Sequence, residues 1–366
     1  MWEAPVIRQR TSVGLDVHAR SVFGCGFDAE TGQVLERRLT PDHGEIIAWI
    51  RSLPPPVMVA YEAGPTGFGL ARALTAAGIE VVVAAPSKLQ RPAGDRVKTD
   101  ARDARHLARL VHLGEVVGVE VPSPEREAAR DLVRAREDCR GDLMAARLRL
   151  SHMLLRHGIV YYGGNAWTGK HELWLRAQRF TTPGLQDAYD SAFDAMLANA
   201  DRRDRLDAAI TQMAADSEFT PVVTRLGCIR GISTLSAFGL AVEIGDWHRL
   251  TGRSIGAYLG LVPTEYSTGA TRSQGSITKT GNSHARRLLI EAAWHHRKPY
   301  RPSQVMRRRW DAASPAARAR GQAANRRLHT RWKHFDQRKK RPVVANAAIA
   351  RELAGWSWSL AVLDDN

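Results

Sequence analysis

Thr11-Ser-Val-Gly-Leu-Asp-Val17 is the stretch that decides the fold of the first part of this 366-residue chain. It is rich in β-forming residues, and it carries the carboxylate Asp16 close to its end. Two further β-rich runs, Val22–Phe27 and Val34–Leu39, follow after short turns. Because short β-rich runs separated by turn residues are typical of neighbouring antiparallel strands, we predict a three-stranded meander.

The rest of the first 120 residues alternates helical and strand patterns. Asp42–Leu53 and Thr66–Ala77 have helical spacing, whereas Val57–Tyr61 and Ile79–Ala84 are short apolar runs typical of buried strands. A meander followed by alternating helix and strand is similar to the ribonuclease H-like plan, whereas a Rossmann fold would open with a βαβ unit and a glycine fingerprint. The sequence therefore predicts an α/β domain over residues 1–120.

The middle of the chain, residues 121–218, has the pattern of an all-helical arm. Pro124–His157 and Leu185–Asp216 both have long helical periodicity. We expect a helical hairpin or coiled coil that separates the flanking domains or dimerises them. Trp167 and Trp174, in the basic segment between the two helices, either stack on nucleobases or pack the arm. The predicted apolar face of the first arm helix consists of Leu132, Leu143, Met144, Leu148 and Leu155.

The last part, residues 219–366, is predicted to be a mainly α domain. Glycines are frequent over Pro221–Trp294, and Leu226–Ala237 resembles a helix-hairpin-helix turn, in which small residues let backbone N–H groups approach a phosphate. Val343–Asp364 has the pattern of a closing helix. The predicted architecture is thus α/β followed by α.

Positive charge is concentrated in one segment of the last domain. The chain has 53 Lys and Arg against 38 Asp and Glu, a net charge of +15. Arg297–Arg341 holds 16 of the basic residues and two of the acids, which amounts to nearly all of the excess. Trp310, Trp332 and Phe335 are interleaved with these charges, so we predict contact with a DNA or RNA backbone.

Other classes of protein are disfavoured by composition. No apolar run approaches the roughly 20 residues needed to span a bilayer, and the first ten residues lack an apolar leader pattern. Cys25, Cys139 and Cys228 stand isolated, which argues against a disulfide framework or a zinc ribbon. We therefore expect a cytoplasmic protein without a membrane partner.

Four acids of the first domain form a candidate metal site. Asp16 and Glu62 come at the ends of predicted strands, and Asp100 and Asp103 are spaced to share one helix face. Taken singly, each is more typical of a solvated loop or a helix cap. Together they are the oxygen ligands that Mg²⁺ prefers, and two such ions can hold the attacking and leaving oxygens of a phosphodiester.

Five motifs carry a resemblance to a known family. Gly14-Leu-Asp-Val-His, Tyr61-Glu-Ala-Gly-Pro-Thr-Gly and Lys98-Thr-Asp-Ala-Arg-Asp-Ala resemble the RuvC-like DEDD domain of bacterial insertion-sequence transposases. Gly260-Leu-Val-Pro-Thr-Glu-Tyr-Ser-Thr-Gly and Gly275-Ser-Ile-Thr-Lys-Thr-Gly-Asn-Ser-His resemble the C-terminal domain of the same transposases. The chain is similar to the Piv/MooV-type group, whose members use a bridge RNA.

The resemblance implies a mechanism and a set of partners. Asp16, Glu62, Asp100 and Asp103 would bind two Mg²⁺ ions, with Mn²⁺ as an alternative, and a C-terminal hydroxyl would form a covalent bond to DNA. The family's register falls on Thr268, whereas the less hindered hydroxyl belongs to Ser267, so both stay open as the nucleophile. The implied partners are element and target DNA, a structured guide RNA, and further copies of the chain as a dimer or tetramer.

Further residues are candidates for binding nucleic acid or for acid–base chemistry. His295 and His296 are candidate bases near the hydroxyl. Two other functions remain open: a junction nuclease that uses water, and a basic nucleic-acid-binding protein without catalysis. The nucleic-acid candidates are Lys279, Asn282, Arg286, Arg287, Arg307, Arg308, Arg309, Arg326 and Arg327.

Overall fold

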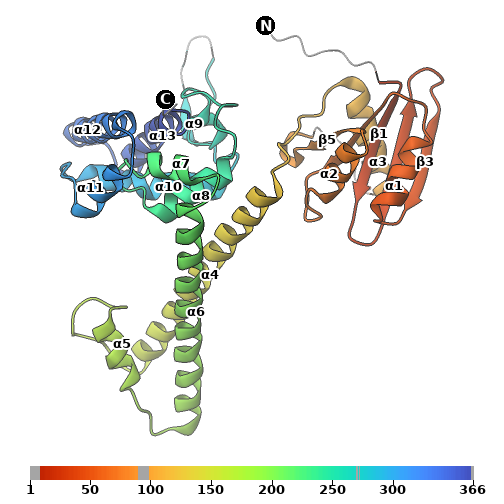
Figure 1. Ribbon diagram of the computed structural model, residues 1–366. Helices are drawn as coiled ribbons and strands as arrows, with labels where there is room; N and C mark the ends of the chain where they lie inside the picture. Colours follow the sequence, from red (N-terminus) through yellow and green to blue (C-terminus); the bar gives the residue numbers. More distant parts are fainter. Residues whose placement is uncertain (1–8, 90–98, 269–270, 272, 364–366) are drawn as a thin grey trace. The chain divides into compact units, whose positions relative to one another are not determined.

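The chain forms two compact units, Met1–Ser123 and Pro124–Asn366 (Figure 1). The computed structural model describes residues 9–89, 99–268, 271 and 273–363. Within these ranges, no helix is long and apolar enough to cross a lipid bilayer.

The first unit is built on a five-stranded sheet with the order β3-β2-β1-β4-β5. The first three strands pair antiparallel, as the predicted meander requires, and β4 and β5 add in parallel beside β1. The α/β prediction is therefore confirmed, and the sheet is consistent with a ribonuclease H-like domain. The strands are β1 (Thr11–Val17), β2 (Val22–Asp28), β3 (Val34–Leu39), β4 (Val57–Glu62) and β5 (Glu80–Ala84).

Helices cover both faces of this sheet. On one face, α1 (His43–Arg51) and α2 (Gly69–Ala76) enclose the main core. On the other face, α3 (Asp100–Leu113) lies against β1 and β2 through small residues. A Cβ atom at Gly14 would lie 2.1 Å from the backbone oxygen of Ala104, so only glycine permits this close approach.

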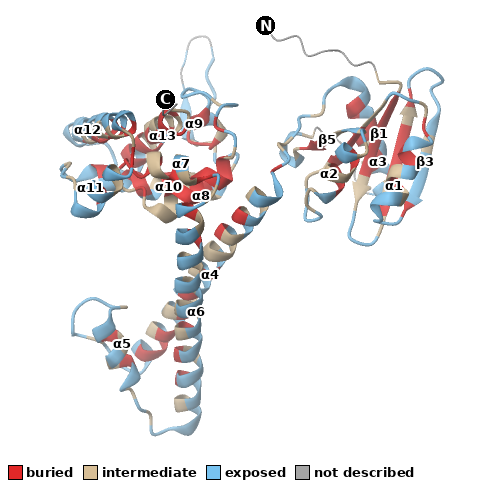
Figure 2. Cartoon of the chain, in the orientation of Figure 1, coloured by how far each residue is buried: buried red, intermediate tan, exposed pale blue. Residues whose placement is uncertain are grey.

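Two long antiparallel helices form the arm of the second unit. α4 (Pro124–Arg156) and α6 (Pro183–Ala215) each have 33 residues, about 50 Å of helix at about 1.5 Å per residue. α5 (Gly169–Arg176) packs near the far end of the arm. Buried and exposed residues alternate along both long helices (Figure 2). This pattern is expected for a two-helix hairpin whose outer faces are exposed to solvent.

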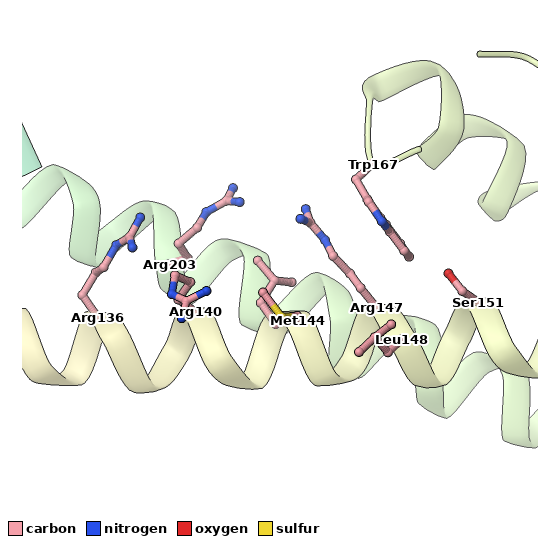
Figure 3. Close-up of a pocket in the computed structure, with 9 residues that line it drawn as sticks. Arg136, Arg140, Met144, Arg147, Leu148, Ser151, Trp167 and Arg203 are labelled. Carbon is pink, nitrogen blue, oxygen red and sulfur yellow. The ribbon is translucent and has the colours of Figure 1, made fainter. Parts of the chain in front are cut away.

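The predicted apolar face of α4 is wrong for three of its five residues. Leu143 is buried and Leu132 is partly buried against the core, but Met144, Leu148 and Leu155 are each more than half exposed. Met144 and Leu148 instead line an open hollow (Figure 3). The helix packs inward through a different stripe, which comprises Ala129, Val133, Cys139, Leu143, Ala146, Leu150, Met153 and Leu154. Small alanines and a cysteine serve here because the two helix backbones approach closely.

A helical bundle forms the rest of the second unit. Its core surrounds α8, whose last eight residues are all buried, and includes Trp332 and Leu328 from the basic segment. A short hairpin, β6 and β7, precedes α10. The elements are α7 (Thr220–Leu226), α8 (Thr234–Ile244), α9 (Ile255–Tyr258), β6 (Pro263–Glu265), β7 (Gln274–Ile277), α10 (Ser283–Trp294), α11 (Gln304–Asp311), α12 (Pro315–Gln337) and α13 (Pro342–Ala361), with short 3₁₀ turns at Pro86–Lys88 and His295–Arg297.

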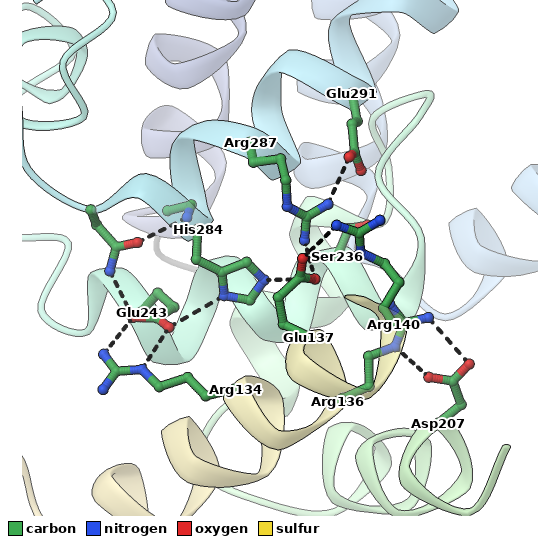
Figure 4. Close-up of polar contacts among 12 residues, drawn as sticks. Arg134, Arg136, Glu137, Arg140, Asp207, Ser236, Glu243, His284, Arg287 and Glu291 are labelled. Atoms are coloured by element: carbon green, nitrogen blue, oxygen red, sulfur yellow. Dashed lines mark hydrogen bonds and ion pairs between the residues drawn. The ribbon is translucent and has the colours of Figure 1, made fainter. Parts of the chain in front are cut away.

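A buried carboxylate joins the arm to this bundle. Glu243 of α8 is 1% exposed and accepts hydrogen bonds from Arg134 of α4 at 3.2 Å and from the Asn282 amide at 2.6 Å (Figure 4). His284 lies 3.3 Å from the same carboxylate. Burial alone would raise the pKa of Glu243, but the bonds from His284, Arg134 and Asn282 lower it to about 2. The charge is therefore retained and compensated inside the protein.

We predict that Glu243→Gln destabilises the second unit by about 3 kcal/mol, because it leaves Arg134 without its counter-charge. Glu172→Gln is the matched control, since Glu172 forms an exposed pair with Arg176 that is worth at most about 1 kcal/mol. The difference between Glu243→Gln and the wild-type protein also depends on pH. A carboxyl whose folded pKa is depressed stabilises above its unfolded value of 4.5, and that contribution fades as the pH falls toward 2. Denaturant unfolding between pH 2 and 4.5 measures the difference in the free energy of unfolding between the two proteins. A difference that stays constant with pH would show that Glu243 is not held as a charged carboxylate.

We also predict that Gly14→Ala lowers the free energy of unfolding of the first unit by about 3 kcal/mol, because the added methyl group meets the backbone of α3. Gly69→Ala at the start of α2 is the control, since its methyl group would meet only the His43 ring, at 3.6 Å. Equal stability of the two variants would show that α3 does not approach β1 this closely.

Candidate active site

The end of β1 and the end of β4 place two predicted site carboxylates side by side. Leu15 pairs with Tyr61 in the parallel register, and the next residues along the two strands are Asp16 and Glu62. Because side chains alternate between the faces of a sheet, Asp16 and Glu62 share the face opposite Leu15 and Tyr61. Asp16 also shares the face of Gly14, which is the face that α3 covers.

The beginning of α3 adds the other two carboxylates to this edge of the sheet. Thr99 caps the helix by accepting a hydrogen bond from the backbone N–H of Arg102, and Asp100 is its first residue. Asp103 follows within the first turn, where the helix dipole favours negative charge. Asp100 is therefore not the cap, although the cap was one reading of this residue.

His18 joins Asp16 and Asp100 in a single cluster. One ligand atom from each of the three lies within 4.8 Å of the other two. The imidazole Nε2 of His18 lies 3.2 Å from Asp16 and 3.8 Å from Asp100. His18 was not among our predicted site residues, although its place two residues after Asp16 in the same motif put it within reach.

The electrostatics of the cluster suit a divalent cation. Partial burial raises the pKa of Asp16, and the negative charges of Asp100 and Asp103 raise it further, while His18 opposes the shift. Crowded carboxylates that repel one another gain most from a bound positive ion. Carboxylate oxygens with one imidazole are ordinary ligands for such an ion. Asp103 acts on Asp16 through its negative charge, and Glu62 lies at the end of the neighbouring strand, outside the three-residue group.

The two candidate nucleophilic hydroxyls lie on an exposed hairpin in the second unit. Ser267 Oγ donates a hydrogen bond of 2.8 Å to Glu265, the last residue of β6. Thr268 instead pairs with Thr271, both through its backbone and through its hydroxyl at 2.9 Å. Ser267 therefore has a carboxylate acceptor, whereas Thr268 is engaged in the turn. Gly269, expected in that turn, lies outside the described residues.

The base of this hairpin is held by a close backbone contact. Gly281 has a positive φ of 68°, and a Cβ atom there would lie 2.0 Å from the carbonyl oxygen of Tyr258. Arg286 reinforces the contact by donating to the carbonyls of Leu259 and Thr280. The Tyr258–Gly281 approach thus fixes both ends of the segment that carries Ser267.

Five of the nine predicted nucleic-acid contacts are engaged within the protein. Asn282 caps α10 through its carbonyl oxygen while its amide binds Glu243, and Arg287 pairs with Glu137 and Glu291. Besides Arg286, two others are engaged: Arg309 donates to the carbonyl of Ile232, and Arg327 pairs with Glu352. Arg327 stays exposed despite its ion pair, and the other exposed candidates are Lys279, Arg307, Arg308 and Arg326.

The aromatic residues of the basic segment have a structural role. Trp332 is fully buried and donates to the carbonyl of Ala293, and Trp310 donates to the carbonyl of Cys228. Phe335 packs against the same core. These three side chains therefore do not support base stacking, and the case for nucleic-acid contact rests on the exposed arginines of α11 and α12.

Among the residues that the structure describes, no hydrogen bond joins either candidate histidine base to the hairpin hydroxyls. His296 is buried, and its pKa falls to about 3 because of burial and the charge of Arg230. His295 lines a hollow beside Gly231, at the turn between α7 and α8. The carboxylate of Glu265 is the acceptor that contacts Ser267.

Known transposases match this chain over both units. Residues 13–159 match the DEDD_Tnp_IS110 model, described as "Transposase", and residues 223–308 match "Transposase IS116/IS110/IS902 family". The "Putative transposase y4qE" of Sinorhizobium fredii is 39% identical over 306 residues, covering 83% of this chain and 75% of that protein. The "Transposase for insertion sequence element IS1533" of Leptospira borgpetersenii is 28% identical and covers 92% of this chain and 99% of that protein.

The two family matches include the carboxylate cluster of the first unit and the hydroxyl-bearing hairpin of the second. A relative with 39% identity over most of both chains leaves the family assignment plain. The chain belongs to the IS110 family of transposases, which act in DNA transposition.

Proposed function

We propose that this transposase cuts and rejoins element and target DNA through a covalent bond between DNA and a hydroxyl of the β6–β7 hairpin. The observation that carries the proposal is the hydrogen bond from Ser267 to Glu265 at 2.8 Å on an exposed hairpin. A hydroxyl needs a proton acceptor to become a nucleophile, and Ser267 has one in place. We therefore favour Ser267 over Thr268.

In the proposed covalent step, this chain supplies both the nucleophile and the acceptor of its proton. Ser267 Oγ attacks the phosphorus of a phosphodiester while its proton passes to the Glu265 carboxylate. The bond from phosphorus to one sugar oxygen breaks, and that oxygen leaves as a hydroxyl after taking a proton from water. A sugar hydroxyl of another strand then attacks the same phosphorus and releases Ser267, so no energy source is needed for rejoining.

The carboxylate cluster of the first unit has a separate role in the proposal. Asp16, Asp100 and His18, with Glu62 and Asp103, would hold divalent metal, by preference two Mg²⁺ ions, with Mn²⁺ as the alternative. Bound metal would supply charge neutralisation at the scissile phosphate. The raised pKa of Asp16 supports this assignment, because the cluster as it stands is crowded with negative charge.

The partners follow from charge and from the reaction. Arg307, Arg308 and Arg326 are exposed in the segment that holds most of the net charge, which supports contact with a polyanion. Rejoining different DNA strands requires more than one active hydroxyl, so we propose a dimer or tetramer. Recognition of the DNA through a bridge RNA, as in the Piv/MooV-type group, completes the proposal.

A metal-dependent nuclease is the second candidate, and one observation favours it. The carboxylate cluster lies in the first compact unit, whereas the hydroxyls belong to the second, and a metal ion held there would activate water without them. In that case the hairpin hydroxyls would only contact DNA.

We predict a covalent protein–DNA adduct when the full-length protein is incubated with its element DNA, guide RNA and Mg²⁺, then denatured and resolved by electrophoresis. Ser267→Ala should abolish the adduct, and Glu265→Gln should lower its yield at least tenfold, since general-base catalysis is worth about a hundredfold or more. Ser276→Ala, on the neighbouring strand β7, is the matched control and should keep the adduct.

Two outcomes would contradict this assignment. An adduct that survives in Ser267→Ala but disappears in Thr268→Ala would move the nucleophile to Thr268. Cleaved DNA ends without any adduct, lost in Asp16→Asn, would identify the nuclease instead.

A further inference from the structure

A hollow on the arm combines arginines with an indole ring. It has a volume of about 420 Å³ and is lined on α4 by Arg140, Met144, Arg147 and Leu148, with Trp167 above them (Figure 3). The remaining lining residues are Arg136, Leu143, Ser151 and Arg203. Four arginines line this hollow, and the described residues that line it include no acid.

Arg147 differs from the other three arginines. Arg136 pairs with Asp207 at 2.7 Å, Arg140 with Glu137 at 2.7 Å, and Arg203 with Asp204 at 2.6 Å. No ion pair involves Arg147 within the part of the chain that the structure describes, and its Nε is buried without a hydrogen-bond partner. A half-buried guanidinium that lacks an anion is costly, because desolvation is not repaid.

The surroundings of Arg147 are short of negative charge. Burial and the positive charge of Arg203 lower the pKa of Arg147, and only Asp204 opposes them. Asp204 itself is 66% exposed and bonded to Arg203. An anionic group placed in the hollow would therefore gain an unpaired cation as its partner.

Trp167 covers this cation in an unusual backbone conformation. Its φ is +62°, a left-handed value that is unfavourable for a bulky residue. The conformation is held by a hydrogen bond from its backbone N–H to His171 at 3.1 Å. The indole ring lies over Arg147, with 5.0 Å from the guanidinium carbon to the ring centroid. The ring belongs partly to the arm core, which fixes it from behind.

We propose that this hollow is a binding site for a nucleotide of an unpaired nucleic-acid strand, with the base against Trp167 and a phosphate on Arg147. An aromatic ring beside a guanidinium that forms no ion pair among the described residues combines the stacking and the positive charge by which proteins bind single strands without reading their sequence. The exposed Met144 and Leu148 offer apolar contact to the base or sugar. The inference rests on the proposed function only in taking a nucleic acid of the reaction as its ligand.

The site is distinct from the DNA-cutting hydroxyl, so its test is binding and not strand transfer. The full-length protein is titrated with fluorescent oligouridine and oligothymidine of about eight nucleotides, and with a duplex of the same length. Photo-cross-linking with thio- or iodo-substituted bases, followed by mass spectrometry, reports which peptide lies beside the base.

Trp167→Asn removes the ring while retaining a residue that tolerates a positive φ. Arg147→Gln removes the charge, and Arg149→Gln, exposed on the same helix, is the matched control. In the wild-type protein we expect cross-links on the peptide that contains Trp167. Trp167→Asn and Arg147→Gln should each lower the yield of that cross-link at least fivefold, whereas Arg149→Gln should leave it unchanged. Oligouridine and oligothymidine distinguish an RNA strand from a DNA strand as the ligand.

Either of two results would overturn the proposal. The first is a cross-link that does not depend on the site. It would then have the same yield in Arg147→Gln, Trp167→Asn and Arg149→Gln, or it would be absent from the wild-type protein and all three variants. The second is an unchanged cross-link together with a shifted oligomeric state in sedimentation, which would assign the hollow to an acidic segment of a second copy of the chain. Failure of the adduct assay leaves these binding results unaffected, so the two proposals fail separately.

Discussion

The contact between α3 and β1 is the constraint on which the rest of the first unit depends. Gly14 leaves room for the backbone of α3, and Cys25, Ala104 and Ala108 keep the surrounding interface small. Because side chains alternate along a strand, the same face that accepts the helix also carries Asp16. The packing of α3 against β1 therefore brings the start of α3 beside the end of β1. This contact places the carboxylates of the cluster close together.

In the second unit, a buried charge fixes how the segments pack. Glu243 bonds to Arg134 on the arm and to Asn282 at the start of α10, so a single buried carboxylate holds three segments in register. Asn282 in turn closes the loop that returns from the Ser267 hairpin. A buried ion pair contributes little net stability when compared with apolar packing, but it strongly penalises arrangements in which a partner is missing. The Glu243 interactions therefore favour one arrangement of α4, α8 and the start of α10 over the others.

Much of the fold could be predicted from the sequence, and the failures have physical reasons. The bounds of β1 and β3 follow from β-rich runs between turn residues, and the long arm helices follow from their period. Helical period did not identify the buried face of α4, because apolar residues lie on two faces and close packing selects the smaller ones, such as Ala146, over Met144. His18 was not predicted, because the ligands that Mg²⁺ prefers are carboxylate oxygens. Glu243 left a signal that was not used, namely one charge in an otherwise apolar helix.

We propose that the convergence of α3 and β1 creates a divalent-metal site. Binding of Mn²⁺ to the full-length protein, followed by electron paramagnetic resonance without nucleic acid, tests this claim most directly. We expect Asp16→Asn and Asp100→Asn each to weaken binding at least tenfold. Glu45→Gln should leave binding unchanged, because the Glu45 carboxylate on α1 accepts its hydrogen bond from Thr40, outside the cluster. Equal Mn²⁺ affinity in all four proteins would contradict the account.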